Sequence, residues 1–142
     1  MIKLNKKISS QTFWVLSCTW GILMTLVGLV TTCILLCGGY RPKRNQYSWY
    51  FEIGENWGGL ELGCMCLTSK NPSQHTLNHE FGHQIQNCVY GPFMVLITLA
   101  SAARYHYRNW SRKHKPNATL PPYDAIWFEG EATKIGNYYK GE

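Results

Sequence analysis

Two histidines and a glutamate have the spacing of a metal site built on a single helix. His79 and His83 are four residues apart, and Glu80 directly follows the first of them, in the sequence His-Glu-Phe-Gly-His. Side chains four residues apart on a helix lie on the same face, one turn apart, so both imidazoles can bind one ion. Glu80 lies beside that face, where its carboxylate can take a proton from water rather than bind the ion.

The chemistry expected of this HExxH pattern is zinc-dependent hydrolysis. Zinc held by three protein ligands keeps a fourth position for water, lowers the pKa of that water to about 7 and polarises a substrate carbonyl. Glu80 is then the general base that takes the proton and passes it to the leaving amine. The opposing interpretation is a solvated helix face that has the pattern by chance. Gly82 argues against it, because a glycine inside the motif allows close approach of another backbone or of substrate.

A downstream segment resembles part of a known family. Residues 127–133, Trp-Phe-Glu-Gly-Glu-Ala-Thr, resemble the ExxAD segment of gluzincin metallopeptidases, most of all the HtpX-type and CAAX-prenyl protease family. In that family a glutamate on a helix after HExxH is the third zinc ligand, and an alanine follows three positions later. Glu129 and Ala132 match. The resemblance therefore implies one zinc ion bound by His79, His83 and Glu129.

The chain is also similar to small uncharacterised bacterial membrane proteins of the metallopeptidase type. These pair a HExGHxxQ helix with a following Gly-Pro and an apolar segment, as residues 79–86 and 91–99 do here. The resemblance covers residues 58–136. It implies an α+β fold, a minimal zincin-like domain with a short sheet edge, an active-site helix and a glutamate helix.

The chain departs from the family pattern at Thr133. The family has an aspartate four residues after the glutamate ligand, and its carboxylate accepts a hydrogen bond from a ligand histidine. Loss of such an outer contact typically costs ~10- to 100-fold in metal affinity or activity. Thr133 can accept the same bond without charge. Alternatively, Asp124 or Glu131 takes over this role.

Three more residues are candidates for the surroundings of the metal. His75 precedes His79 by four residues and so lies on the same helix face, either as a contact to the ligands or substrate or as a polar residue near the helix start. Tyr123 and Tyr138 are candidates to stabilise the oxyanion of a tetrahedral intermediate. The alternative for both tyrosines is a packing role.

The element before the motif is expected to be a strand. Residues 58–68 alternate in the way typical of a half-buried strand, with Leu60 and Leu62 on one face and Glu61 exposed on the other. In zincins, peptide substrates pair with such an edge strand as an added strand, which orients the scissile bond.

The remaining boundaries follow from turn and helix signals. A turn over 71–73 leads to a helix from 73 to about 89, which Gly91-Pro92 ends. The polar, basic, proline-containing stretch 105–122 is expected to be a loop. A helix of mixed character over 123–139 follows it.

The first apolar segment predicts a membrane anchor. Residues 13–37 hold no charged residue, and as a helix they would be roughly 37 Å long, against about 30 Å for the hydrocarbon core of a bilayer. A cleaved signal peptide is the alternative, but its apolar region should be about 7 to 15 residues long and end at a cleavage site. We therefore expect an uncleaved transmembrane helix, preceded by a basic tail over 1–12. Residues 38–57 read as a linker, in which residues 49–51 lie at the headgroup level or in a small core.

A second apolar segment, residues 88–103, is marginal as a membrane span. It belongs to the domain expected over 58–142. A packed or re-entrant helix is preferred over a full span, because a second span would place Glu129 across the membrane from the start of the motif helix.

The positive charge favours a membrane partner over nucleic acid. The net charge is +6, and the cations flank the apolar segments, as membrane insertion and anionic headgroups favour. Their distribution places the site near the cytoplasmic face. They are Lys3, Lys6, Lys7, Arg41, Lys43, Arg44, Arg104, Arg108, Arg112, Lys113 and Lys115.

The sequence therefore predicts a membrane-anchored zinc endopeptidase that acts on peptides or membrane proteins near the lipid. One alternative is a catalytically inactive relative that binds zinc and serves as a membrane scaffold. Another is a small membrane protein, pore-forming or toxin-like, that has the motif by coincidence and binds no stoichiometric zinc. The oligomeric state is left open.

Overall fold

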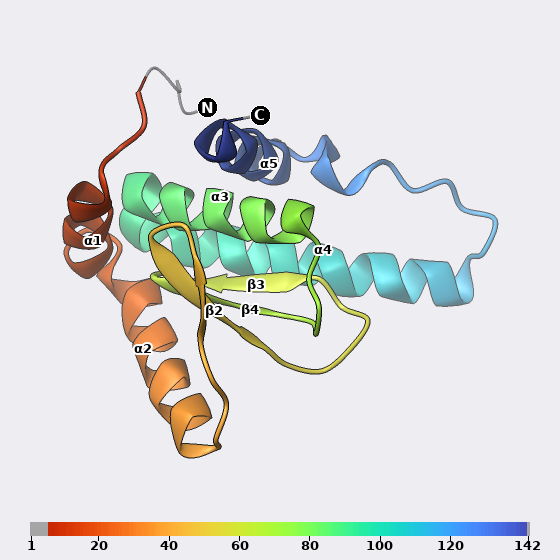
Figure 1. Ribbon diagram of the computed structural model, residues 1–142. Helices are drawn as coiled ribbons and strands as arrows, with labels where there is room; N and C mark the ends of the chain where they lie inside the picture. Colours follow the sequence, from red (N-terminus) through yellow and green to blue (C-terminus); the bar gives the residue numbers. More distant parts are fainter. Residues whose placement is uncertain (1–5, 142) are drawn as a thin grey trace.

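The computed structural model describes residues 6–141, so Lys3 and the first part of the expected basic tail lie outside the described residues. The fold is α+β, with a small sheet beside a group of helices (Figure 1). In chain order the elements are α1 (Ser10–Cys18), α2 (Ile22–Cys37), β1 (Lys43–Asn45), β2 (Ser48–Glu52), β3 (Gly59–Leu62), β4 (Met65–Thr68), α3 (Gln74–Tyr90), α4 (Met94–His114) and α5 (Trp127–Lys140). Two 3-10 turns, η1 (Gly91–Phe93) and η2 (Tyr123–Ala125), precede α4 and α5.

The sheet is mixed, with the strand order β1-β2-β4-β3. The expected linker over 38–57 supplies two of its strands, so this prediction was wrong. Tyr50 and Phe51 of β2 are buried in the core, which settles their role in favour of packing. Strand β2 pairs in parallel with β4. This pairing joins segments that are distant in the sequence, so no pattern within residues 38–57 predicts it.

The single strand expected over 58–68 is instead a hairpin. Strands β3 and β4 are antiparallel, and the chain reverses at Gly63, whose φ is 70°. The backbone of Thr25 lies so close that a Cβ on Gly63 would be 2.4 Å from the Thr25 nitrogen. The reversal therefore needs glycine, both for its dihedral angle and for the space. It leaves β3 as an edge strand.

Helix α3 confirms the predicted motif helix. The Ser73 hydroxyl caps its start by accepting from the Thr76 N–H at 3.1 Å, and Gly91 follows its last residue with φ 55°. The helix packs against α5 and against β3 and β4. Two glycines bring α3 and α5 together, because a Cβ on Gly82 or Gly136 would lie 1.9 Å from a carbonyl oxygen of the other helix. The close backbone approach expected at Gly82 is thus present.

Helix α4 corrects the loop expected over 105–122. The helix continues to His114, and only the connection after it is irregular. No glycine or proline interrupts residues 94–114, and cations fill the last turn, where they favour the negative end of the helix dipole. A polar sequence was mistaken for a loop because only one side of this helix is buried.

The first apolar segment is not one straight helix. Helices α1 and α2 meet at 95°, and only the two together are long and apolar enough for a membrane span. Asn87 holds the bend, because its Nδ2 donates to the Gly21 carbonyl at 3.3 Å. Helix α2 has 16 residues, about 24 Å, which is shorter than a bilayer core. By length and composition, one helical stretch of the described chain, residues 74–114, could cross a membrane, with 33% of its most apolar window buried.

Candidate metal centre

Three side-chain atoms from two helices converge on one point. The Nε2 atom of His79 and that of His83, both on α3, are 3.2 Å apart. Glu129 in the first turn of α5 places its Oε2 atom 3.0 Å from the first nitrogen and 3.2 Å from the second. This confirms that the three predicted residues form a group able to hold a metal ion.

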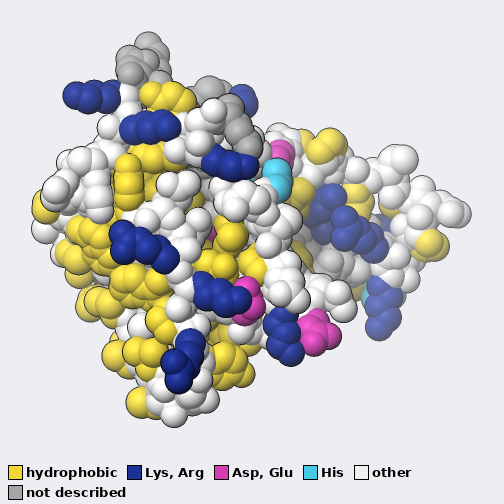
Figure 2. Space-filling view, viewed as in Figure 1, with side chains coloured by type: hydrophobic (Ala, Val, Ile, Leu, Met, Phe, Trp, Pro, Cys, Tyr) yellow, Lys and Arg dark blue, Asp and Glu magenta, His cyan; other side chains and the backbone are white. Residues whose placement is uncertain are grey.

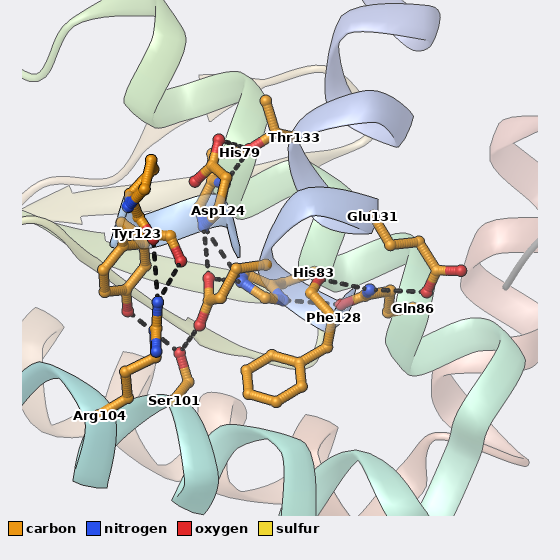
Figure 3. Close-up of polar contacts among 12 residues, drawn as sticks. His79, His83, Gln86, Ser101, Arg104, Tyr123, Asp124, Phe128, Glu131 and Thr133 are labelled. Atoms are coloured by element: carbon orange, nitrogen blue, oxygen red, sulfur yellow. Dashed lines mark hydrogen bonds and ion pairs between the residues drawn. The ribbon is translucent and has the colours of Figure 1, made fainter. Parts of the chain in front are cut away.

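His79 is oriented by a chain of two hydrogen bonds. Thr133 has one hydroxyl proton, which it donates to Asp124 at 3.0 Å. Its oxygen is 2.8 Å from the Nδ1 atom of His79 and therefore accepts from Nδ1–H. The proton on Nδ1 leaves the Nε2 lone pair of His79 directed at the group (Figure 3). Two of the three residues considered as substitutes for the missing aspartate act together, since the Thr133 hydroxyl makes the contact and Asp124 supplies the charge behind it.

His83 is oriented in the same way by Gln86. Both amide protons of Gln86 are engaged, one by the carbonyl of Phe128 and one by the carboxylate of Glu131, each at 2.9 Å. The Gln86 amide oxygen therefore accepts from His83 Nδ1–H at 2.7 Å. Tyr90 also donates to Glu131, at 2.7 Å. Glu131 thus acts on His83 through Gln86 and makes no direct contact with it.

Glu129 is the most enclosed of the three ligands. Its side chain is fully buried, and its second oxygen, Oε1, accepts from the Ser101 hydroxyl of α4. Burial alone would raise the pKa of Glu129, but His79, His83 and Ser101 around the carboxylate outweigh it and lower the pKa well below its usual range. The carboxylate is therefore ionised at neutral pH.

The arrangement fits a metal cation. Because the Nδ1–H groups are used in the outer hydrogen bonds, the Nε2 atoms are the ones that can bind an ion, together with Glu129. Burial opposes a charge on His83, but Glu129 and the other nearby carboxylates outweigh it and raise the pKa of His83 to about 9, so an ion would displace a proton there. The three atoms lie within 3.0 to 3.2 Å of one another, close enough to bind one ion. Two imidazoles and one carboxylate are also a ligand set of catalytic zinc sites.

The group lies in the wall of a cavity of about 680 Å³. The edge strand β3 borders the cavity on one side and α4 on another, with the first half of α3 between them. Glu80 lines it next to the ligands, against the start of β3, where a Cβ on Gly59 would lie 2.4 Å from the Glu80 carboxylate. Glu80 accepts no hydrogen bond from any of residues 6–141.

Of the other predicted site residues, some line the cavity and one does not. His75 lines the cavity, with its ring 6.5 Å from that of His79, and Tyr123 lies 6.4 Å from the same ring. Tyr138 does not line the cavity. It lies at the end of α5 beside Lys7, so the structure does not bring it to the candidate site.

Glu61 is buried, which corrects the expectation of an exposed strand residue. The hairpin turns its carboxylate towards the N–H of Gly63, and Thr98 of α4 approaches it at 3.5 Å. The alternation pattern failed because both faces of this edge strand are covered near the cavity.

Two functional residues were missed from sequence. Gln86 is three positions after His83 and so lies near it on the helix, a signal that the HExGHxxQ similarity already contained. Ser101 is different. It comes from α4, and no pattern in that segment indicates a position at the site, so only the tertiary structure reveals it.

No protein-family model matches the chain, and the comparisons with curated proteins and with solved structures found no match. The function therefore has to be argued from the site itself.

Proposed function

We propose that this protein is a zinc-dependent endopeptidase. The observation that carries the proposal is the convergence of His79, His83 and Glu129 in the wall of a cavity that also holds the unengaged carboxylate of Glu80. The spacing of the motif alone is compatible with a chance occurrence. The outer hydrogen bonds, which turn both imidazole lone pairs inward, are hard to explain for a solvated helix face.

His79, His83 and Glu129 would hold the ion. When bound there, zinc supplies a Lewis acid and an acidified water at neutral pH. The protein contributes the orientation of the ligands through Thr133 and Gln86, and the fixed position of Glu129 through Ser101. These contacts hold the ligands before substrate arrives, so no reorganisation is needed during the reaction.

Glu80 is the general base of the proposed reaction. Its carboxylate takes a proton from the attacking water and returns it to the amine of the leaving peptide. Gly59 leaves room for this side chain beside β3. A substrate that lies along β3 as an added strand would therefore pass over Glu80 and the ligands together.

Tyr123 could donate a hydrogen bond to the developing oxyanion after turning from the Ser101 hydroxyl, which lies 3.3 Å from its own and whose proton goes to Glu129. Burial, before all other influences, raises the pKa of Tyr123 to about 12, so its hydroxyl keeps its proton at neutral pH. The ring is held by the guanidinium groups of Arg104 and Arg108, 5.8 and 5.7 Å from its centroid. Of the two tyrosines considered, this is the one at the cavity.

An inactive zinc-binding scaffold remains the alternative proposal. This alternative was based on the family's aspartate, which is replaced by Thr133 in this chain. The hydrogen bond from Thr133 to Asp124 weakens that argument, because a carboxylate still lies behind His79. Both proposals use the same three ligands. They differ only in whether Glu80 acts as a general base.

The test compares metal content and peptide hydrolysis in four forms of the full chain purified in detergent. These are the wild type, Glu80→Gln, His79→Ala and the control Glu55→Gln, which changes an exposed glutamate paired with Lys70. Hydrolysis is followed with a mixed library of extended peptides, and metals are identified by mass spectrometry.

We expect about one zinc per chain in the wild type, in Glu80→Gln and in Glu55→Gln, and none in His79→Ala. Hydrolysis should be lost in Glu80→Gln and His79→Ala and kept in the control. Zinc without hydrolysis in the wild type would favour the scaffold. Full activity of Glu80→Gln would reject the mechanism, and absence of metal from the wild type would reject both proposals.

A further inference from the structure

Helix α4 has two opposite faces of different character. Thr98, Ser101, Ala102 and Tyr105 face the cavity. On the other side, apolar side chains recur every three or four residues and stay exposed. They are Phe93 (64% exposed), Leu96 (64%), Leu99 (62%), Ala103, Tyr107 (57%) and Trp110 (47%). Ordinary surface helices do not expose a continuous apolar stripe of this length, so a partner is expected there.

This outer face of α4 continues onto α2. At the turn between α3 and α4, Trp20 donates to the Val89 carbonyl at 3.0 Å and packs on Gly91. Leu23 and Val27 then follow on α2, with 48% and 51% of their surface exposed. Helix α2 contacts both η1 and α4, so the two apolar faces join.

Cations border this surface at the far ends of both helices. Lys113 and Lys115 are exposed at the end of α4, and Arg41 and Arg44 are exposed after α2. On the face seen in Figure 2, apolar side chains gather over α1 and α2, with Lys and Arg side chains beside them. Tyr107 and Trp110 lie between the apolar part of α4 and its cations, the position that aromatic residues take at a membrane surface.

An in-plane position of α4 agrees with its chemistry better than a membrane crossing. A helix that crosses the bilayer alone is apolar all round, whereas α4 carries hydroxyl and cationic groups on the cavity side. The α3 half of the 74–114 stretch is enclosed by the sheet and α5. An amphipathic helix with cations and aromatic residues of this kind lies in the membrane interface.

We propose that the outer face of α4, together with the adjoining face of α2, binds the surface of a bilayer that contains anionic lipids, with α4 lying parallel to the membrane. The cavity then lies on the side of α4 away from the lipid, about one helix diameter (~10 Å) above it. Segments of other proteins close to the membrane would reach it first. The membrane placement itself is independent of whether the site hydrolyses peptides.

The experiment measures the depth of single labelled positions in vesicles. The full chain carries Cys18→Ser, Cys33→Ser and Cys37→Ser, while the buried Cys64, Cys66 and Cys88 stay. A fluorescent label is attached at Leu96→Cys, Ala103→Cys or Tyr107→Cys on the outer face. Ala102→Cys is the matched control, since it changes a neighbouring alanine on the cavity face.

Each labelled variant is checked for an unchanged circular dichroism spectrum. The vesicles contain zwitterionic and anionic phospholipids with a nitroxide quencher either near the headgroup or deep in the acyl chains. We expect the labels at positions 96, 103 and 107 to lose fluorescence to the shallow quencher to a similar extent. The label at position 102 should lose little.

Positions 96 and 107 are roughly 16 Å apart along the helix axis. A gradient of depth between them would therefore show a crossing helix and overturn the proposal. Equal quenching at positions 102 and 103 would overturn the assigned face. Labels shielded from both quenchers, with energy transfer between chains, would identify a second copy of the protein as the partner instead. Unchanged quenching in purely zwitterionic vesicles would remove the anionic lipid from the proposal.

Discussion

At the scale of single residues, Thr133 shows how a neutral side chain can take the place of a carboxylate. It touches the ligand His79, while the charge lies one hydrogen bond further away on Asp124. The hydroxyl fixes the direction of both bonds, because its only proton goes to the carboxylate. The tautomer of His79 is therefore set without an acidic group in contact with its Nδ1 atom.

Thr133→Val should weaken zinc binding. Valine keeps the shape of threonine but can neither accept from His79 nor reach Asp124, and loss of such an outer contact costs ~10- to 100-fold in metal affinity. Thr133→Ser keeps the hydroxyl and should bind nearly as well as the wild type. Competition with a chromophoric chelator measures the affinity. Equal affinities of the valine and serine variants would contradict the role assigned to the hydroxyl.

The ionisation of Glu61 should lower the free energy of unfolding as the pH rises. Burial, assisted by the nearby charge of Glu80, raises the pKa of Glu61 from 4.5 to about 8, although His83 and the Gly63 N–H oppose the shift. The folded protein therefore keeps a proton that the unfolded chain releases. The contribution of Glu61 to stability is fully present below pH 4.5 and is lost as the pH rises to about 8.

Glu61→Gln should remove this loss, because the amide does not ionise. The variant should equal the wild type near pH 4.5 and unfold at a higher temperature near pH 8. The control Glu55→Gln should keep the slope of the wild type. Thermal unfolding in detergent across this range measures the difference, and parallel curves for Glu61→Gln and wild type would contradict the assignment.

At the scale of elements, the contact between α3 and α5 holds the two parts of the site together. His79 and His83 belong to α3, and Glu129 belongs to α5. Gly82 lies between the two histidines at the point where the backbones meet. A Cβ there would be 1.9 Å from the Ala132 oxygen, so any side chain would push the helices apart.

Gly82→Ala should therefore destabilise the fold and separate the ligands. Overpacking of this kind typically costs about 1–3 kcal/mol, occasionally more. Gly58→Ala is the matched control, because nothing lies within 4 Å of a Cβ at that position. Denaturant unfolding and zinc content should both fall in the first variant and stay near wild type in the second. An undisturbed Gly82→Ala would show that α3 and α5 can move apart freely.

The elements also show where sequence reasoning works. The helix over 73–89 was predicted well, because its cap at Ser73, its motif and its end at Gly91 are all local signals. The strands β1 and β2 were not predicted, since β2 forms by pairing with β4 across a connection that the linker residues do not encode. The second half of α4 was missed for a related reason. Its polar residues line a cavity, and a cavity cannot be read from one segment.

At the scale of the whole molecule, a metal ion would act as a cross-link in a small protein. Without a metal ion, the fully buried carboxylate of Glu129 contacts the two imidazoles alone. With one, three ligands from α3 and α5 are tied together, and α4 is held to them through Ser101. The core is split into two clusters, one between the sheet and α4 and one around Phe13 and Phe81. The three ligands belong to α3 and α5, and these helices border both clusters.

Removal of metal should therefore lower the unfolding temperature of the whole chain. An ion that binds only the folded state stabilises it by ~4 kcal/mol when its free concentration is a thousand times its Kd. Thermal unfolding is measured after a chelator, and again after zinc or magnesium is restored. Zinc should recover the stability, whereas magnesium should not, because it prefers oxygen ligands in a near-octahedral arrangement.

Glu129→Gln should be insensitive to zinc, while His75→Ala, which changes a histidine on the same face outside the ligand group, should respond as the wild type does. If zinc were shown to be bound and its removal by the chelator left the unfolding temperature of the wild type unchanged, the ion would not link α3 to α5. Glu129 would then have to be removed from the ligand set.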